Sequence, residues 1–277
     1  MSEKVALVTG ASSGIGEATA LALRQAGFIV YGAARRIDRM AGLAEQGVRV
    51  LAMDVTDDAS AQAGVARILA EAGRIDVLVN NAGYGSYGAV EDVPLDEARA
   101  QFEVNVFGAA RLMQLVLPAM RAQRSGKIVN VSSMGGKIHT PLGGWYHSSK
   151  FALEGLSDCV RVEVAPFGID VVVVEPGAIE TEWGGIAAGQ LTKASGDGAY
   201  AAQAEAMAAA MTVERTGLMR PSAPTVIGDT IRTAVSANRP RTRYASGAGA
   251  KPLLLMRRVL SDRLFDRLIS RATGAPR

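Results

Sequence analysis

Residues 5–20 read VALVTGASSGIGEATA, a short apolar run followed by glycines at positions 10, 14 and 16 and then by an alanine-rich segment. This order predicts a strand, a tight turn and a helix whose first N–H groups are free to meet a pyrophosphate. The spacing G-x-x-x-G-x-G differs from the G-x-G-x-x-G fingerprint, so only the mechanism of that motif transfers. A plain strand-to-helix connection is the alternative, and the position directly after the first strand favours the nucleotide site.

Short apolar runs bounded by turn residues recur through the first two-thirds of the chain, at 5–8, 28–34, 48–53, 75–80, 127–131 and 169–175. Continuous apolar strands are typical of a parallel sheet that is covered on both faces. Segments with helical spacing alternate with these runs. Right-handed crossovers would therefore build an α/β fold, a doubly wound Rossmann-like sheet with helices on both faces.

We expect residues 1–277 to form a single domain, because α/β folds of this length commonly surround one sheet. Within it, 1–181 would form the dinucleotide-binding and catalytic core, 182–223 a mobile, partly helical substrate-binding loop insertion, and 224–277 the last helix and strand of the core plus a C-terminal extension. The spacing of apolar residues in this extension predicts one amphipathic helix that covers the substrate loop or a partner subunit. A helix that lies on a membrane surface is the less favoured alternative. The apolar face of the extension would carry Leu253, Met256, Leu260, Leu264 and Leu268.

Composition excludes several classes of protein. The chain is 48% hydrophobic and 21% charged, which argues against disorder. A net charge of +3 without a long Lys/Arg run argues against nucleic acid as a partner. Cys159 is the single cysteine, so it cannot form an internal disulfide, and we expect it to be a small buried residue. The N-terminus lacks a signal-peptide pattern and no apolar run reaches the ~18 residues of a membrane span, so a cytoplasmic location is predicted.

The end of the second predicted strand reads Ala33, Ala34, Arg35, Arg36. In dinucleotide-binding folds this edge lies beside the adenosine ribose, where a carboxylate receives the 2′-OH and a basic group receives a 2′-phosphate. Because a guanidinium binds phosphate through two donors, the sequence predicts NADP in preference to NAD. Asp38 is the competing acidic candidate, and we interpret it as a helix N-cap.

Tyr146 and Lys150 stand four residues apart in YHSSK, and they follow NNAG at 80–83, Asn105 in FEVNVFG and NVSS at 130–133. PGAIET at 176–181 comes after them. With the glycine turn, these motifs occur in an order that resembles the short-chain dehydrogenase/reductase family over roughly residues 4–245. Within that family the pattern is similar to the branch of 17β-hydroxysteroid and retinol dehydrogenases and bacterial carbonyl reductases.

The resemblance implies a catalytic tetrad of Asn105, Ser133, Tyr146 and Lys150, with Ser133 preferred to Ser132 because the family's serine precedes the tyrosine by thirteen residues. It also implies an NADP site, with Asp54 and Val55 at the adenine, Arg35 at the phosphate and Thr181 at the nicotinamide carboxamide. Ser13 is a departure, since some NADP-dependent members carry a basic residue there. No metal site is expected. The predicted cofactor-binding residues are Gly10, Ser12, Ser13, Gly14, Ile15, Gly16, Arg35, Arg36, Asp54, Val55, Asn81, Ala82, Gly83, Tyr146, Lys150, Pro176, Gly177, Ile179 and Thr181.

These residue types can perform a carbonyl reduction. A tyrosine, with a pKa of about 10, is too weak an acid alone, but a charge pair at ~4 Å in an effective dielectric of about 20 is worth about 4 kcal/mol, roughly three pKa units. We therefore expect the Lys150 ammonium to lower the pKa of Tyr146. Ser133 would hydrogen-bond the substrate oxygen, and Asn105 would hold a water that connects Lys150 to solvent. His147 is expected on the helix surface, and His139 has no evident partner.

The apolar residues beyond Pro176 favour a hydrophobic ketone or aldehyde as the small-molecule substrate. They include Trp183, Ile186, Leu191, Met207 and Met211, with Leu142 and Trp145 nearby. By resemblance, the helix that begins near Tyr146 would pair across a two-fold axis, so we expect a homodimer or homotetramer. The sequence favours an NADPH-dependent reductase. An alcohol dehydrogenase working in the oxidising direction and a catalytically silent NADP-binding sensor are the alternatives.

Overall fold

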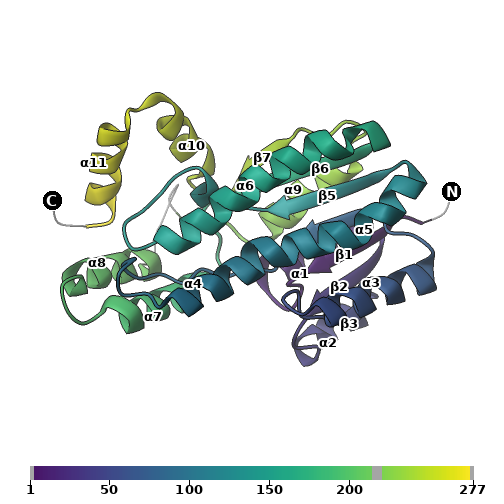
Figure 1. The fold of residues 1–277 in the computed structure, drawn as a ribbon, viewed down its shortest axis with the longest axis horizontal. Coiled ribbons are helices and arrows are strands. Elements are labelled where there is room, and N and C mark those ends of the chain that lie inside the picture. The colour runs from purple at the N-terminus through teal and green to yellow at the C-terminus, as the bar shows by residue number, and fades with distance from the viewer. Residues whose placement is uncertain (1–2, 214–219, 275–277) are drawn as a thin grey trace.

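Seven strands form one parallel sheet in the computed structural model, which describes residues 3–213 and 220–274 (Figure 1). The strands are β1 (Val5–Thr9), β2 (Ile29–Ala34), β3 (Arg49–Ala52), β4 (Val77–Asn80), β5 (Gly126–Val131), β6 (Ile169–Pro176) and β7 (Arg243–Ser246). Their order across the sheet is β3-β2-β1-β4-β5-β6-β7. The chain winds outward from β1 to β3 and then returns to β4 on the other side of β1. The doubly wound fold is confirmed, and its switch point lies between β1 and β4, where such sheets bind ligands.

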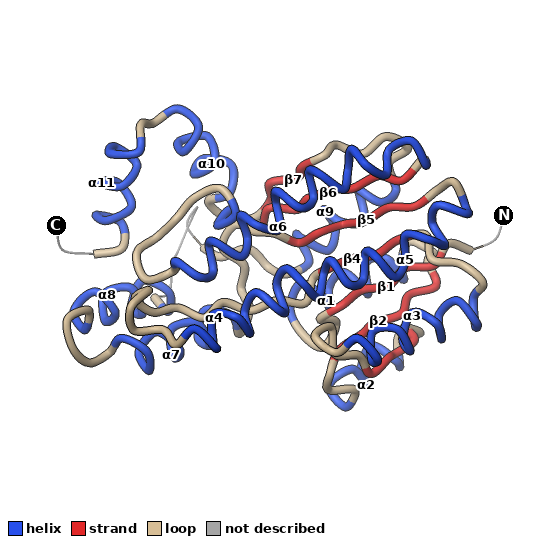
Figure 2. The backbone as a smooth tube through the Cα atoms, viewed as in Figure 1, coloured by secondary structure: helices blue, strands red, loops and turns tan. Residues whose placement is uncertain are grey.

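Helices cover both faces of the sheet (Figure 2). On one face lie α1 (Gly14–Gln25), the short η1 (Asp38–Met40), α2 (Ala41–Glu45) and α9 (Thr225–Ser236); on the other lie α3 (Asp58–Ala72), α5 (Ala109–Gln123) and α6 (Gly144–Val164). The side chains that alternate along each strand supply both cores. On β1, for example, Ala6 and Val8 pack toward α1 while Val5 and Leu7 pack toward α3 and α5. Burial on both faces explains why these strands read as continuous apolar runs.

Most of the other elements before the C-terminal extension lie at the carboxyl end of the strands. They are α4 (Leu95–Phe102), the π-helical turn η2 (Glu103–Gly108), η3 (Met134–Gly136), α7 (Trp183–Ser195) and α8 (Ala201–Thr212), together with η4 (Ala165–Phe167) after α6. The insertion predicted at 182–223 contains α7 and α8, which pack against each other through Leu191 and Met207. Residues 214–219 of this segment lie outside the described residues.

The C-terminal extension is two helices, α10 (Ala250–Val259) and α11 (Asp262–Ala272), so the prediction of one helix is wrong. Leu260 adopts an extended backbone that ends α10, and Ser261 is the N-cap of α11. Ser261 has the extended backbone of an N-cap, and Asp262 in the first turn complements the helix dipole, so this break is encoded locally. Phe265 and Ile269 are buried against Ile138, which follows η3, whereas Leu264, expected on the apolar face, is exposed. None of the described helices combines the length and the apolar character that a membrane span needs.

Candidate active site

The glycine turn between β1 and α1 is a close-packed cradle. Gly10 and Gly14 have φ angles of +65° and +57°, which glycine adopts without strain. A Cβ on Gly16 would lie 2.1 Å from the carbonyl oxygen of Gly10 and 2.6 Å from Nδ2 of Asn81. The predicted turn therefore needs glycine for backbone conformation at its first positions and for space at its last. The start of α1 faces the same edge, where its dipole favours an anion.

Thr9 joins this turn to the end of β4. Its Oγ1 accepts hydrogen bonds from the backbone N–H groups of Asn81 (3.0 Å) and Ala82 (3.1 Å). The Asn81 side chain donates in return to the carbonyl oxygen of Thr9 at 2.9 Å. The predicted segment Asn81, Ala82 and Gly83 is thus fixed beside the glycine turn. Sequence reasoning missed Thr9, although its place at the end of the first strand, directly before Gly10, is a usable signal.

The end of β6 reaches the same place from the other half of the sheet. A Cβ on Gly14 would lie 3.1 Å from Cγ2 of Thr181, so Thr181 covers the glycine turn. The backbone N–H of Gly177 donates to the carbonyl oxygen of Ser246 (2.8 Å), and Ile179 forms a bridge with Ser222. These contacts hold the segment that follows Pro176 against β7 and the residues before α9, while Thr181 brings it to the glycine turn.

Arg35 and Arg36 are exposed at the end of β2. The pKa of Asp54 lies below its ordinary value. Burial of the carboxyl would raise this pKa, but the hydrogen bonds from Thr56 and the positive charges of Arg35 and Arg111 outweigh that effect. Arg35 therefore lies on the same side of the sheet as the predicted adenine residue. Asp38 is the first residue of η1, and the N-cap of that helix is Ile37, so the interpretation of Asp38 as an N-cap is wrong.

Ser133 and Tyr146 meet at the carboxyl edge of β5. Tyr146 lies in the first turn of α6 and its side chain is hydrogen-bonded to that of Ser133. The hydroxyl of Ser133 also accepts a hydrogen bond from the N–H of Gly135 at 2.9 Å. The neighbouring Ser132 Oγ is buried and has no hydrogen-bond partner among the described residues. Of the two serines in NVSS, Ser133 is therefore the one that the fold places on Tyr146.

Burial dominates the protonation of Tyr146 and Lys150. It raises the pKa of Tyr146 to about 12, while the hydrogen bond with Ser133 opposes the rise. It lowers the pKa of Lys150 to about 8, against the charge of Glu154. The expectation that Lys150 lowers the pKa of Tyr146 is wrong for the protein alone. The Nζ atom of Lys150 donates to the carbonyl oxygen of Val131 at 3.0 Å, and desolvation of a phenol penalises its anionic form.

Asn105 is buried in the π-helical turn η2, and π-helical turns are frequent at functional sites. Its Nδ2 donates to the carbonyl oxygen of Tyr84 (2.9 Å) and to Oγ of Ser149 (3.0 Å), and its Oδ1 accepts from the N–H of Tyr84. A Cβ on Gly83 would lie 3.0 Å from Oδ1 of Asn105 and 3.5 Å from Nζ of Lys150. The two polar groups therefore flank one point beside Gly83.

An aromatic cluster covers Tyr146. The ring of Trp183, at the start of α7, lies 5.3 Å from that of Tyr146, and the ring of Tyr87 lies 5.5 Å from it. Gly85 makes this packing possible, because a Cβ there would be 2.5 Å from the indole of Trp183. Leu142, Leu191, Met207 and Met211 belong to the same apolar cluster. Ile186, which we expected in this wall, is exposed.

Three further expectations are wrong or incomplete. His147 is buried rather than on the surface: its Nδ1 donates to the carbonyl oxygen of Gly135, its Nε2 accepts from Thr140, and burial lowers its pKa. Cys159 is exposed, because it falls on the outer side of α6. His139 does have a partner, since it lies 2.9 Å from Asp266 on α11.

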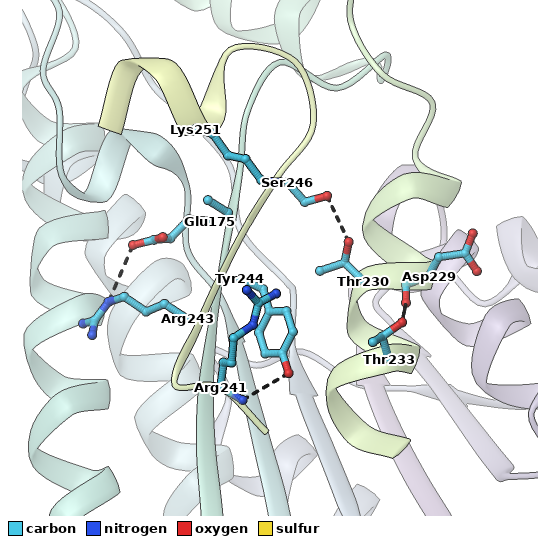
Figure 3. Close-up of a pocket in the computed structure, with 10 residues that line it drawn as sticks. Glu175, Asp229, Thr230, Thr233, Arg241, Arg243, Tyr244, Ser246 and Lys251 are labelled. Carbon is cyan, nitrogen blue, oxygen red and sulfur yellow. Dashed lines mark hydrogen bonds and ion pairs between the residues drawn. The ribbon is translucent and has the colours of Figure 1, made fainter. Parts of the chain in front are cut away.

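Sequence reasoning also missed a cluster of charges behind α6. Glu154, one turn beyond Lys150, is 2% exposed and accepts hydrogen bonds from Arg243 on β7 at 3.1 and 3.0 Å. Lys137 approaches the same carboxylate at 3.1 Å. Arg243 also pairs with Asp158 (2.7 Å) and with Glu175 (3.6 Å), and Figure 3 shows the latter contact. The spacing of Lys150 and Glu154 on one helical face was the available signal, but it does not reveal burial.

Comparisons with known proteins are consistent with this geometry. The family model described as short chain dehydrogenase matches residues 4–188. The chain is 45% identical over 181 residues to the 3-ketodihydrosphingosine reductase of Bacteroides thetaiotaomicron, which covers 65% of this chain and 66% of the relative, just under two thirds. It is 33% identical over 276 residues to the NADPH-dependent 3-dehydrocapnine reductase of Ornithobacterium rhinotracheale, covering 96% of this chain and 95% of the relative. The crystal structure of a short-chain dehydrogenase from Streptomyces avermitilis matches with a TM-score of 0.80 at 35% identity, over 99% of this chain and 96% of that one.

Proposed function

Because this chain belongs to the short-chain dehydrogenase family and is thus an NAD(P)-dependent oxidoreductase, we propose that it uses NADPH to reduce the ketone or aldehyde of a hydrophobic substrate. The observation that carries the proposal is the meeting of Ser133, Tyr146 and Lys150 at the edge of the sheet that also bears the glycine turn. When a nucleotide site and a proton-donating side chain lie at the same edge of a sheet, the arrangement suits hydride transfer to a carbonyl group.

NADP fits the features of this edge. Gly16 packs so closely on the carbonyl oxygen of Gly10 and on the Asn81 amide that no side chain fits there, and this packing holds the turn at the start of α1, where free N–H groups suit a pyrophosphate. Arg35 offers a guanidinium for a 2′-phosphate, and the relative named as NADPH-dependent supports the same preference over NAD. When bound, the cofactor supplies the hydride, and the protein supplies position and charge.

Tyr146 is the proposed general acid. Since burial raises its pKa to about 12, its phenol carries a proton at neutral pH and can donate it to the oxygen of a reduced carbonyl. Ser133 donates a hydrogen bond to the same oxygen, a contact whose loss typically costs about a hundredfold or more in rate. Lys150, with a pKa of about 8, is largely an ammonium at pH 7 and stabilises the phenolate that remains. Asn105 holds the water through which that phenolate regains its proton from solvent.

A hydrophobic, lipid-like or steroid-like ketone suits the apolar cluster around Tyr146. Two relatives are named for the reduction of 3-ketodihydrosphingosine and of 3-dehydrocapnine, which supports a keto substrate. A cytoplasmic homodimer or homotetramer is part of the proposal. Its support is that Val162 on α6 is 69% exposed and Phe151 on the same helix 45% exposed, because an oligomer interface would cover such side chains.

NADPH oxidation at 340 nm against a panel of carbonyl compounds tests the proposal. The panel pairs long-chain 3-keto amines and steroid ketones with short ketones and phosphorylated keto sugars. We expect turnover to rise with the apolar area of the substrate and NADPH to be used in preference to NADH. Equal rates with the keto sugars would contradict the substrate class, and a preference for NADH would contradict the cofactor.

A further inference from the structure

We propose that Glu154 is a positioning residue that acts through Lys150, fixing α6 to β7 and keeping the lysine in its ammonium form. The inference rests on the proposed function, because it assigns Lys150 a charged role. A carboxylate on the same helical face, one turn from a buried lysine, is the nearest anion that α6 itself can offer.

The geometry of Glu154 is that of a fixed charge. One carboxylate oxygen receives Nε and Nη2 of Arg243 at 3.1 and 3.0 Å and Nζ of Lys137 at 3.1 Å. The other oxygen is buried and has no hydrogen-bond partner among the residues that the structure describes. Burying a carboxylate with an unpaired oxygen is costly, and an apolar side chain would stabilise the helix at least as well. A role in the charge balance of the site is a sufficient reason for this arrangement.

The charges that face Glu154 come from each surrounding element. They are Lys150 and Asp158 on α6, Lys137 after η3, Glu175 on β6 and Arg243 on β7. On the other side of Lys150 lie the neutral groups of Tyr146, Asn105 and the carbonyl oxygen of Val131. Burial favours loss of the Lys150 proton, and Glu154 is the carboxylate whose charge opposes that loss.

The far end of this cluster opens to solvent. Glu175 and Arg243 line a cavity of about 510 Å³ beside β7, away from the glycine turn (Figure 3). Arg243 therefore connects Glu175, which lines the cavity, to the buried Glu154. Asp158, on the same helix and the same arginine, is partly exposed and lies about two helical turns from Lys150. Asp158 is thus a matched control for Glu154.

The experiment compares Glu154→Gln with Asp158→Asn in the full chain, measuring kcat between pH 6 and 10. Each variant removes one carboxylate from Arg243 while keeping a side chain of the same shape. We expect the alkaline limb of the profile to move down by about one pH unit in Glu154→Gln and to stay in place in Asp158→Asn. NADPH affinity, measured by fluorescence, should fall at a correspondingly lower pH in Glu154→Gln, since Lys150 would contact the cofactor.

A limb that is unchanged in Glu154→Gln, or that moves equally in both variants, would overturn the proposal, because a structural role predicts no selective change. Lys137→Met is the second test, and it can still be carried out if Glu154→Gln does not fold. Because Lys137 partly neutralises Glu154, its removal should move the alkaline limb of the kcat profile to higher pH. A movement to lower pH would overturn the proposal. If the parent itself shows no turnover, the proposed function fails. The pH dependence of NADPH affinity then decides between the two carboxylates.

Discussion

Replacing Gly16 with alanine tests the nucleotide cradle. The new Cβ would lie 2.1 Å from the carbonyl oxygen of Gly10 and 2.6 Å from Nδ2 of Asn81, distances that atoms do not tolerate. Either the turn or the amide that bonds Thr9 must therefore move. Overpacking of this kind costs about 1–3 kcal/mol of unfolding free energy. A displaced hydrogen bond to a phosphate is worth about 1.5–3 kcal/mol, so NADPH affinity should fall at least about tenfold.

Gly155→Ala is the matched control. Gly155 is also helical, in α6, and its added Cβ would meet nothing within 4 Å. Since alanine is the better helix former, this variant should gain about 0.5–1 kcal/mol and bind NADPH as the parent does. Urea unfolding and fluorescence titration measure the two quantities. Unchanged NADPH affinity in Gly16→Ala would refute the placement of the cofactor at this turn.

Two further predictions concern single charged side chains. Arg35→Asp should weaken NADPH far more than NADH, and an unchanged ratio of their dissociation constants would show that the 2′-phosphate lies elsewhere. Burial and the charge of Glu154 raise the pKa of Glu175 from 4.5 to about 7, so the folded state holds a proton that the unfolded state releases between these values. Stability should thus fall as pH rises from about 4.5 to about 7, by at most about 3 kcal/mol. Glu175→Gln should be more stable than the parent at pH 8 and no more stable at pH 4, as thermal unfolding would reveal; equal stability at both values would contradict this.

Local pattern was enough to predict the sheet and the edge that carries the site. Continuous apolar strands require two covered faces, and parallel strands bring their carboxyl ends to one edge. Gly10, Asn81 and Ser133 each follow a strand and Pro176 ends one, so the topology alone gathers them at that edge.

The features of the site that could not be predicted from the sequence depend on packing between elements that are far apart in the chain. The burial of His147 depends on the loop that carries Gly135 and Thr140, and the aromatic cover of Tyr146 depends on where α7 begins. The helical spacing of Tyr146 and Lys150 predicts a lowered pKa for the tyrosine, but spacing along a helix does not reveal how deeply the phenol is buried. Desolvation by the surrounding cluster raises this pKa instead. The pairing of Glu154 with Arg243 likewise joins residues 89 positions apart.

The most direct test of the proposed reduction is the turnover of NADPH and a hydrophobic ketone by Tyr146→Phe, with NADPH affinity measured on the same preparation. The substitution removes one hydroxyl from a packed ring, so we expect cofactor binding to be retained and the rate to fall by about a hundredfold or more. Comparable turnover by Tyr146→Phe and the parent would contradict the role of Tyr146 as the proton donor.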